Sequence, residues 1–431
     1  MKKYSYKDLS ADDLNLLCQR PKMDFRSIFG QVEPIIEKVE REGDAGINYY
    51  NQKFDGAAPD PIVINPQQKK VSLDSEIKQA LDTAFDNIYR FHEAQLPAPL
   101  EVETMPGVQC KRVARPIERV GLYIPGGTAI LPSTLMMLGI PAMLAGCSTI
   151  VVATPPKSDG SVADEILYLA KKIGATHLLK AGGAQAVAGM ALGTESVPKV
   201  DKILGPGNQY VTVAKMMLQN SEAQIAIDMP AGPSEVLVIA DGTANPAFVA
   251  ADLLSQAEHG EDSQVVLVAT NDFDLNICLQ AIEHQLTELP RQEIARKSIE
   301  QSFSVTVNNL DEALDFSNRY APEHLILQCQ NPELYEDQIM NAGSVFLGKW
   351  TPESAGDYAS GTNHTLPTYG YARMFSGVSV DSFLKQITMQ QITANGLKNV
   401  GPVIEKLAEL EELEAHKNAV SIRLKEIKKN I

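Results

Sequence analysis

Gln256 and His259 stand three residues apart in the stretch LLSQAEHGED, at 253–262. Residues at positions i and i+3 lie on one face of a helix, so the two side chains can converge on one point. An oxygen donor and an imidazole on one face supply two metal ligands, and Zn²⁺ is the borderline ion that suits them. The ordinary alternative is a helix-terminal histidine that interacts with the negative end of the helix dipole. The spacing alone leaves both interpretations open.

A carboxylate and an imidazole stand seven residues apart in TPESAGDYASGTNHTLPT, at 351–368. Asp357 and His364 lie among small residues, where backbone can approach a ligand closely. They could share a metal, or one could bind the metal while the other contacts substrate. An Asx-turn aspartate with a surface histidine is the alternative.

Glu323 and His324 are neighbours in RYAPEHLIL, at 319–327. Neighbours on a regular strand point to opposite faces, so both serve one site only from the loop before the strand. Pro322 favours an extended entry into that strand. An imidazole is the usual proton acceptor at neutral pH, and a nearby carboxylate can activate water. A surface ion pair is the alternative.

Three glycine-rich turns occur in VGLYIPGGTAILPST, KAGGAQAVAG and ILGPGNQYVTVAK. Each follows an apolar run and opens a helix, where backbone amides and the helix dipole accept phosphate. None matches G-x-G-x-x-G, because the nearest stretch, 205–210, has Tyr210 in place of the third glycine. A dinucleotide would therefore bind without the strict fingerprint.

The hydrophobic pattern predicts the elements that position these residues. Residues 1–95 are mainly helical by their apolar spacing, and 100–116 indicates two short strands joined by a Pro-Gly turn. From 119 onward, short apolar runs such as VGLYI and QVVLVAT alternate with helical stretches, which is typical of parallel sheets covered by helices. We therefore expect two α/β units of similar size. The last fifty residues are helical and must pack on the chain itself or on a partner subunit.

Composition narrows the class of protein. The 431 residues carry a net charge of −16, which argues against nucleic acid or an anionic membrane as the main partner. The first residues, MKKYSYKDLSADDL, lack the apolar stretch of a secretory signal, and no apolar run approaches a membrane span. Five scattered cysteines without a C-x-x-C pair indicate reduced thiols, so a cytoplasmic location is expected. His92, His177 and His284 lie in regular patterns and are expected to be structural or surface residues.

Taken together, nine segments resemble one family, histidinol dehydrogenase. In chain order they are VGLYIPGG, GGAQA, GTESVPKVDKILGPGN, DMPAGPSEV, LLSQAEHG, PEHLI, GSVFLG, ESAGDYASGTNH and AHKNAV. The likeness covers nearly the whole chain. Each motif is short, but their common order makes chance similarity negligible.

The resemblance implies oxidation of L-histidinol to L-histidine through L-histidinaldehyde, with two hydride transfers to NAD⁺, at the end of histidine biosynthesis. The family's members are zinc-dependent homodimers. The resemblance therefore implies one Zn²⁺ per subunit and a C-terminal arm that completes the partner's site.

The fold that the resemblance implies is α/β, with two incomplete Rossmann-like parallel-sheet domains and two small domains, the C-terminal one helical. The expected boundaries are 1–25 with 96–118 for one small domain, 26–95 with 233–378 for the Rossmann-like domain carrying the catalytic and metal residues, 119–232 for the dinucleotide-binding domain, and 379–431 for the C-terminal helical arm.

The resemblance also assigns roles to residues of this chain. The Zn²⁺ ligands would be Gln256, His259, Asp357 and His416. His324 would be the general base that removes the hydroxyl proton, and Glu323 would activate the water that adds to the aldehyde. Substrate contacts would come from Ser234, His364 and Glu411, together with Gln256, His259, His324, Asp357 and His416. The dinucleotide would be held by Tyr123, Gln185 and Asn208.

Three other functions remain compatible with the residues themselves. A zinc hydrolase would use Glu323 to activate water without a dinucleotide. A non-catalytic protein would bind the metal for stability only. A thiol-dependent aldehyde dehydrogenase is disfavoured because none of the five cysteines has an activating polar setting in the sequence.

Overall fold

The computed structural model describes residues 1–20, 25–126, 130–229 and 232–429. Its internal contacts divide the chain into two compact units. The first unit contains residues 1–95 and 118–383, and the second contains residues 96–117 and 384–431. Each unit is described by itself.

One sheet of the first unit, the β5 sheet, has six strands in the order β2-β7-β6-β5-β8-β9. The strands are β2 (Val63–Ile64), β5 (Arg119–Tyr123), β6 (Thr149–Thr154), β7 (His177–Lys180), β8 (Lys202–Leu204) and β9 (Ala226–Ile227). All neighbouring strands are parallel except β2, which pairs antiparallel with β7. Their nearly continuous apolar sequences fit a sheet that is buried on both faces.

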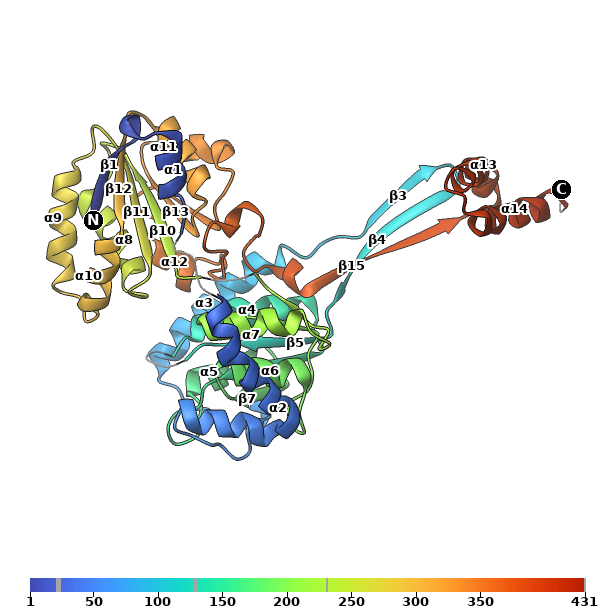
Figure 1. Ribbon diagram of the computed structural model, residues 1–431, viewed down its shortest axis with the longest axis horizontal. Helices are drawn as coiled ribbons and strands as arrows, with labels where there is room; N and C mark the ends of the chain where they lie inside the picture. The colour runs from blue at the N-terminus through green and yellow to red at the C-terminus, as the bar shows by residue number, and fades with distance from the viewer. Residues whose placement is uncertain (21–24, 127–129, 230–231, 430–431) are drawn as a thin grey trace. The chain divides into compact units, whose positions relative to one another are not determined.

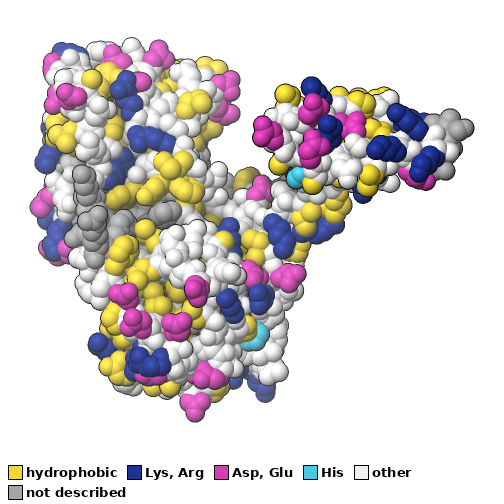
Figure 2. Space-filling view, turned by 45° about the vertical axis from the view of Figure 1, so that its right-hand side comes forward, with side chains coloured by type: hydrophobic (Ala, Val, Ile, Leu, Met, Phe, Trp, Pro, Cys, Tyr) yellow, Lys and Arg dark blue, Asp and Glu magenta, His cyan; other side chains and the backbone are white. Residues whose placement is uncertain are grey.

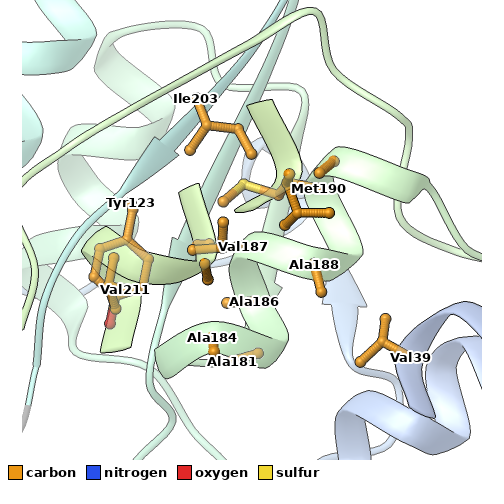
Figure 3. Close-up of a cluster of buried hydrophobic side chains, with 14 of the residues drawn as sticks. Val39, Tyr123, Ala181, Ala184, Ala186, Val187, Ala188, Met190, Ile203 and Val211 are labelled. Carbon is orange, nitrogen blue, oxygen red and sulfur yellow. The ribbon is translucent and has the colours of Figure 1, made fainter. Parts of the chain in front are cut away.

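Helices cover both faces of the β5 sheet (Figure 1). One face carries α2 (Phe25–Phe54, interrupted at Gly43), α6 (Gly183–Leu192) and α7 (Gln209–Gln219). The other face carries α3 (Ser75–Glu93), α4 (Pro132–Ala145) and α5 (Asp164–Lys172). Figure 3 shows the core on the α6 side, where Val187 and Met190 lie near Ile203 of the sheet and Val39 projects from α2.

The second sheet of this unit, the β10 sheet, is wholly parallel, in the order β1-β12-β11-β10-β13-β14. Its strands are β1 (Lys2–Ser5), β10 (Glu235–Ala240), β11 (Gln264–Thr270), β12 (Phe303–Val307), β13 (His324–Gln328) and β14 (Ser344–Leu347). One face is covered by α8 (Pro246–Ala257), α9 (Leu275–Leu286) and α10 (Gln292–Gln301), and the other by α1 (Ala11–Leu17) and α11 (Leu310–Tyr320). The short helix α12 (Glu353–Tyr358) follows β14.

Both sheets share one topology, which confirms the prediction of two Rossmann-like units. Numbering each set of five parallel strands from β5 or from β10 gives the spatial order 3-2-1-4-5 in both sheets. In such sheets the strand order reverses at a switch point between strands 1 and 4. That switch point lies between β5 and β8 in one sheet and between β10 and β13 in the other.

The second unit is a three-stranded antiparallel sheet with two helices. The strands are β3 (Leu100–Met105), β4 (Val108–Pro116) and β15 (Leu384–Ile392), and the helices are α13 (Ala394–Leu410) and α14 (Glu414–Lys429). The hairpin predicted around 100–116 is present, with Gly107 at a φ of +82° in its turn. Short 3₁₀ helices elsewhere in the chain are η1 (Tyr6–Asp8), η2 (Pro66–Gln68), η3 (Pro332–Gln338), η4 (Tyr371–Arg373) and η5 (Val380–Phe383).

The predicted grouping of the N-terminal segments differs from the observed one. Residues 1–25 were expected beside 96–118, but β1 pairs with β12 and Leu14 of α1 packs into the core of the β10 sheet. Residues 26–95 were expected beside 233–378, but α2, β2 and α3 pack on the β5 sheet. Segment 96–118 pairs instead with β15. Apolar periodicity identifies an amphipathic helix without saying which of two similar sheets it covers.

The surface carries charged side chains of both signs, although the chain as a whole is acidic. On the face drawn in Figure 2, acidic and basic side chains are interspersed. Within the described residues, no helix combines the length and the apolar character that crossing a bilayer requires.

A buried ion pair fixes the turn after β8. Gly205 has a φ of +134°, and a Cβ there would lie 2.1 Å from the carbonyl oxygen of Tyr123. Its N–H donates to Asp228 at 2.7 Å, and its carbonyl accepts from Lys215 Nζ at 2.9 Å. Lys215 and Asp228 also pair with each other at 2.5 Å, with side chains 1% and 5% exposed. The pair therefore holds both polar groups of a glycine that no other residue could replace without strain.

Replacing Lys215 with Met should lower the free energy of unfolding by about 3 kcal/mol, because it leaves the buried Asp228 carboxylate without its cation. Urea and thermal unfolding followed by circular dichroism measure this loss. The control is Arg119→Met, which breaks the more exposed pair with Asp201 and should cost much less. Equal losses in the two variants would contradict the assignment.

Candidate functional site

Glu323 and His324 lie at the amino end of β13, at the switch point of the β10 sheet. His324 is the first residue of the strand, Glu323 precedes it, and both are buried. The neighbouring strand fixes both side chains through Glu235: its N–H donates to Glu323 Oε2 at 2.8 Å, and its carbonyl accepts from His324 Nδ1 at 3.0 Å. The two neighbouring residues are therefore held together at the entry to the strand, and their service of one site stays a prediction.

The geometry of His324 fixes its tautomer. A carbonyl only accepts, so Nδ1 carries the proton and Nε2 keeps its lone pair. Nε2 is buried without a hydrogen-bond partner and lies 3.8 Å from Asp357 Oδ1. Burial lowers the pKa of His324 to about 4, against the opposing effect of the Asp357 carboxylate. The ring is therefore a neutral imidazole whose free nitrogen can accept a proton.

Burial has the opposite effect on Glu323. It raises the pKa of the Glu323 carboxyl well above its ordinary value, although the Glu235 N–H works in the other direction. Glu323 Oε2 lies 3.6 Å from His324 Nδ1. A carboxylate with a raised pKa is a stronger base than an exposed one, which suits the activation of water.

Asp357 and His364 are held against each other. Asp357 lies in α12, and its carbonyl accepts from His364 Nδ1 at 2.8 Å. The other ring nitrogen of His364 lies 3.4 Å from Thr134 Oγ1, at the start of α4 beside the β5 sheet. Burial lowers the pKa of His364, with Asp357 opposing. His364 therefore connects α12, which follows the last strand of the β10 sheet, to α4 beside the β5 sheet.

Gln256 and His259 come from the C-terminal end of α8. Gln256 lies in the last turn and is 1% exposed, whereas His259 stands just beyond the helix and is exposed. The ring of His259 donates from Nδ1 to the Ser255 carbonyl at 3.0 Å. Its charge acts on the pKa of both His324 and His364. His259, Asp357, His324 and His364 thus lie within electrostatic reach of one another.

Gln256 meets one requirement of a metal ligand. Both polar atoms of its amide are buried without a partner, an arrangement that is rare unless something else binds them. Within the described part of the chain, no three His, Cys, Asp or Glu side chains stand close enough to hold a metal by themselves. An amide oxygen, an imidazole and a carboxylate form a donor set that Zn²⁺ accepts.

The remaining predicted residues are placed as follows. Ser234 is half-buried next to Glu235, and its carbonyl accepts from the Gln264 N–H at 3.1 Å. Glu411 caps the C-terminus of α13 and His416 lies in α14, both exposed and both in the second unit. The first unit by itself therefore brings together the residues from α8, β13 and α12, and the roles of Glu411 and His416 remain predictions.

Two buried carboxyl groups beside this cluster were not singled out from the sequence. Glu353 is 1% exposed, both its oxygens lack partners, and burial raises its pKa well above the ordinary value, with Asp357, Glu323 and Asp252 adding to the rise. Burial also raises the pKa of Asp252 to about 6, although Gln328 donates to it at 2.5 Å. The one available signal was spacing, because Glu353 precedes Asp357 by four residues and Asp252 precedes Gln256 by four.

The three residues from the glycine-rich turns line one cavity of about 660 Å³ at the carboxyl edge of the β5 sheet. Tyr123 ends β5, and its hydroxyl accepts from the Gly183 N–H at 3.0 Å. Gln185 lies in the first turn of α6 and donates to Asn51 at 3.3 Å. The Asn208 side chain caps α7 by accepting from the N–H groups of Tyr210 and Val211. Turns that are distant in sequence therefore meet at the switch point, the position at which doubly wound folds generally bind nucleotides.

Comparison with known proteins agrees with this geometry. The model of the histidinol dehydrogenase family matches residues 18–424. A chloroplastic histidinol dehydrogenase of Arabidopsis thaliana is 58% identical over 99% of this chain and 92% of its own, and that of Aliivibrio fischeri is 50% identical over 99% and 97%. A crystal structure of histidinol dehydrogenase from Elizabethkingia anophelis is 51% identical and superposes over 99% of both chains with a TM-score of 0.94. The chain therefore belongs to the histidinol dehydrogenase family.

Proposed function

We propose that this chain oxidises L-histidinol to L-histidine through L-histidinaldehyde, reducing two molecules of NAD⁺ at the end of histidine biosynthesis. Family membership supports the overall reaction. The observation that carries the chemistry is the buried His324, whose Nε2 has no hydrogen-bond partner and lies 3.8 Å from the Asp357 carboxylate. The protein would be located in the cytoplasm.

His324 would act as the base in both oxidations. In the first, Nε2 takes the hydroxyl proton while the carbinol carbon loses hydride to NAD⁺ and becomes the aldehyde. Glu323 then takes a proton from a water that adds to the aldehyde carbon, and the protonated His324 gives its proton to the aldehyde oxygen. These two transfers give the hydrated form and a neutral His324. In the second oxidation, His324 takes a hydroxyl proton from this hydrate as hydride leaves to the second NAD⁺, which gives the carboxylic acid; the acid then loses its remaining proton to solvent and becomes the carboxylate.

Zn²⁺ would be held by Gln256, His259, Asp357 and His416. When bound, the ion would coordinate the imidazole and amine of histidinol and so orient the carbinol carbon. Ser234, His364 and Glu411 would contact the substrate together with these ligands and His324. The dinucleotide would lie in the cavity lined by Tyr123, Gln185 and Asn208.

The active form would be a homodimer. In the family, the C-terminal arm completes the partner's site, which would bring Glu411 and His416 to the active site of a second copy. Exposed apolar side chains on the second unit, such as Leu407, Leu410 and Ile422, suit an interface with another subunit.

Purified chain, supplied with histidinol and excess NAD⁺, should form about two equivalents of NADH per histidinol, because each of the two oxidations transfers one hydride. Absorbance at the nicotinamide band and chromatography of histidine give the ratio. One equivalent would show that the aldehyde is not oxidised further. Consumption of an ester or amide without NAD⁺ would favour the zinc hydrolase instead.

Gln256→Leu should weaken zinc binding by roughly tenfold or more, because leucine fills the same buried space without a ligand oxygen. Competition with a chromophoric chelator measures the affinity independently of turnover. Gln285→Leu on the neighbouring helix α9 is the control, since this side chain is only half-buried and donates to the Ala247 carbonyl in a solvent-exposed hydrogen bond. Unchanged zinc affinity in the Gln256 variant would remove this residue from the ligand set.

A mixture of His324→Ala and His416→Ala chains tests whether the site is shared. Each homodimer should lose activity by roughly 10²- to 10⁴-fold, since each lacks a base or a ligand. Random pairing yields half heterodimers with one intact site each, so about a quarter of wild-type activity should return if the C-terminal arm crosses over. The readout is NADH formation after denaturation and joint refolding. A mixture no more active than its components would mean that the site is built within one chain.

A further inference from the structure

Glu235 forms a buried ion pair with Arg20, a residue 215 positions earlier in the chain. The guanidinium donates from Nε and Nη2 to the two carboxylate oxygens, each at 2.8 Å. The two side chains are 4% and 2% exposed. Nη1 donates to the Cys18 carbonyl, also at 2.8 Å. A bidentate pair of this kind fixes orientation as well as distance.

An aromatic ring supports the guanidinium from one side. The Arg20 guanidinium lies over the ring of Tyr320, 3.5 Å from its centroid. Tyr320 is fully buried, its hydroxyl donates to Gln264 at 2.7 Å, and its ring stacks on Phe316. Arg20 is thus held by a carboxylate, a carbonyl and an aromatic ring. Lysine cannot make the same set of contacts, because it lacks the planar guanidinium with its several N–H donors.

The partner of Arg20 is the residue that orients both proposed catalytic side chains. The Glu235 N–H bonds Glu323 and its carbonyl bonds His324, while its side chain also accepts from the Tyr369 N–H at 3.1 Å. Glu235 is the first residue of β10, so the strand ladder continues from it in one direction only. A shift of this residue would move both catalytic groups at once.

A buried ion pair is a poor source of stability, because removing two charges from water costs about as much as their attraction returns. Its advantage is fixed geometry. We propose that Arg20 is a positioning residue for the Glu323–His324 pair, acting through Glu235. This inference rests on the proposed function, because the groups that Arg20 would align are the proposed base and water-activating carboxylate.

Arg20→Met should reduce kcat for histidinol oxidation on the order of tenfold or more, since small misplacements of reacting groups have large effects on rate. The KM values for histidinol and NAD⁺ should stay unchanged, and so should the zinc content. Among the described residues, Arg20 contacts Glu235 and not the proposed ligands of substrate, dinucleotide or zinc. Arg20→Lys should recover part of kcat. A wild-type kcat in the methionine variant, or an effect on KM alone, would overturn the proposal.

The double variant Arg20→Met/Glu235→Met separates positioning from stability. It leaves no unpaired charge, so the thermal midpoint should return to the wild-type value or above it, as replacement of buried ion pairs by apolar residues often allows. If Arg20 acts by positioning, kcat should remain low in this stable protein. Recovery of kcat together with stability would show that the pair serves folding alone. Arg119→Met, at the more exposed pair with Asp201, is the control and should keep wild-type kcat.

The ¹⁵N resonances of selectively labelled His324 test the same inference without turnover. Loss of the Arg20 guanidinium should shift the Nδ1 signal, because the hydrogen bond to the Glu235 carbonyl changes. An unchanged signal would overturn the proposal even in an active enzyme. Absence of NADH formation by the wild-type chain would instead refute the proposed function and leave this readout valid.

Discussion

The backbone of Glu235 is the constraint on which the candidate site depends. Strands β10 and β13 run side by side with Val236 opposite His324, so the residue before Val236 lies next to the entry of β13. There the N–H and carbonyl of one residue bind the carboxylate of Glu323 and the imidazole of His324. The tautomer of the histidine follows from this contact, and with it the nitrogen that can accept a proton. The register of the two strands therefore determines which nitrogen of the proposed base is free to accept a proton.

The two sheets have the same strand order, but the proposed dinucleotide site and the proposed catalytic site use opposite edges of them. At the carboxyl edge of the β5 sheet, α6 and α7 begin, and their positive ends favour the phosphates of a dinucleotide. The predicted catalytic residues lie instead at the amino edge of the β10 sheet, where the preceding helices α8 and α11 end. Negative helix ends favour cations. At the other edge of the β10 sheet, Asp241 after β10 accepts from the Gln330 N–H at 2.9 Å and so ties together the ends of the two strands at the switch point.

Sequence spacing predicted those features that are set within a single helix, strand or turn. The alternating strands and helices, the hairpin at 100–116 and the pairing of Glu323 with His324 at a strand entry were all recognisable. Spacing does not tell which of two similar sheets an amphipathic helix covers, so residues 26–95 were assigned to the wrong one. Nor does it reveal contacts between distant segments. Arg20 and Glu235 have no local pattern in common, and Glu353 resembles an ordinary helix-start glutamate until its burial is known.

The buried carboxyl groups explain why this edge of the β10 sheet would attract positive charge. Asp252, Glu323, Glu353 and Asp357 interact electrostatically, and burial raises the pKa of the first three. Like charges in a low dielectric repel each other, so ionising all four together is costly without a counterion. Arg20 pairs with the Glu235 carboxylate and so does not neutralise these four groups. A divalent metal and the ammonium of an amino alcohol would supply the missing charge, and each would bind more tightly because the other carboxylates remain close by. The same repulsion would disfavour an anionic ligand, which is consistent with the proposed binding of an amino alcohol and the proposed release of the amino acid once its own carboxylate has formed.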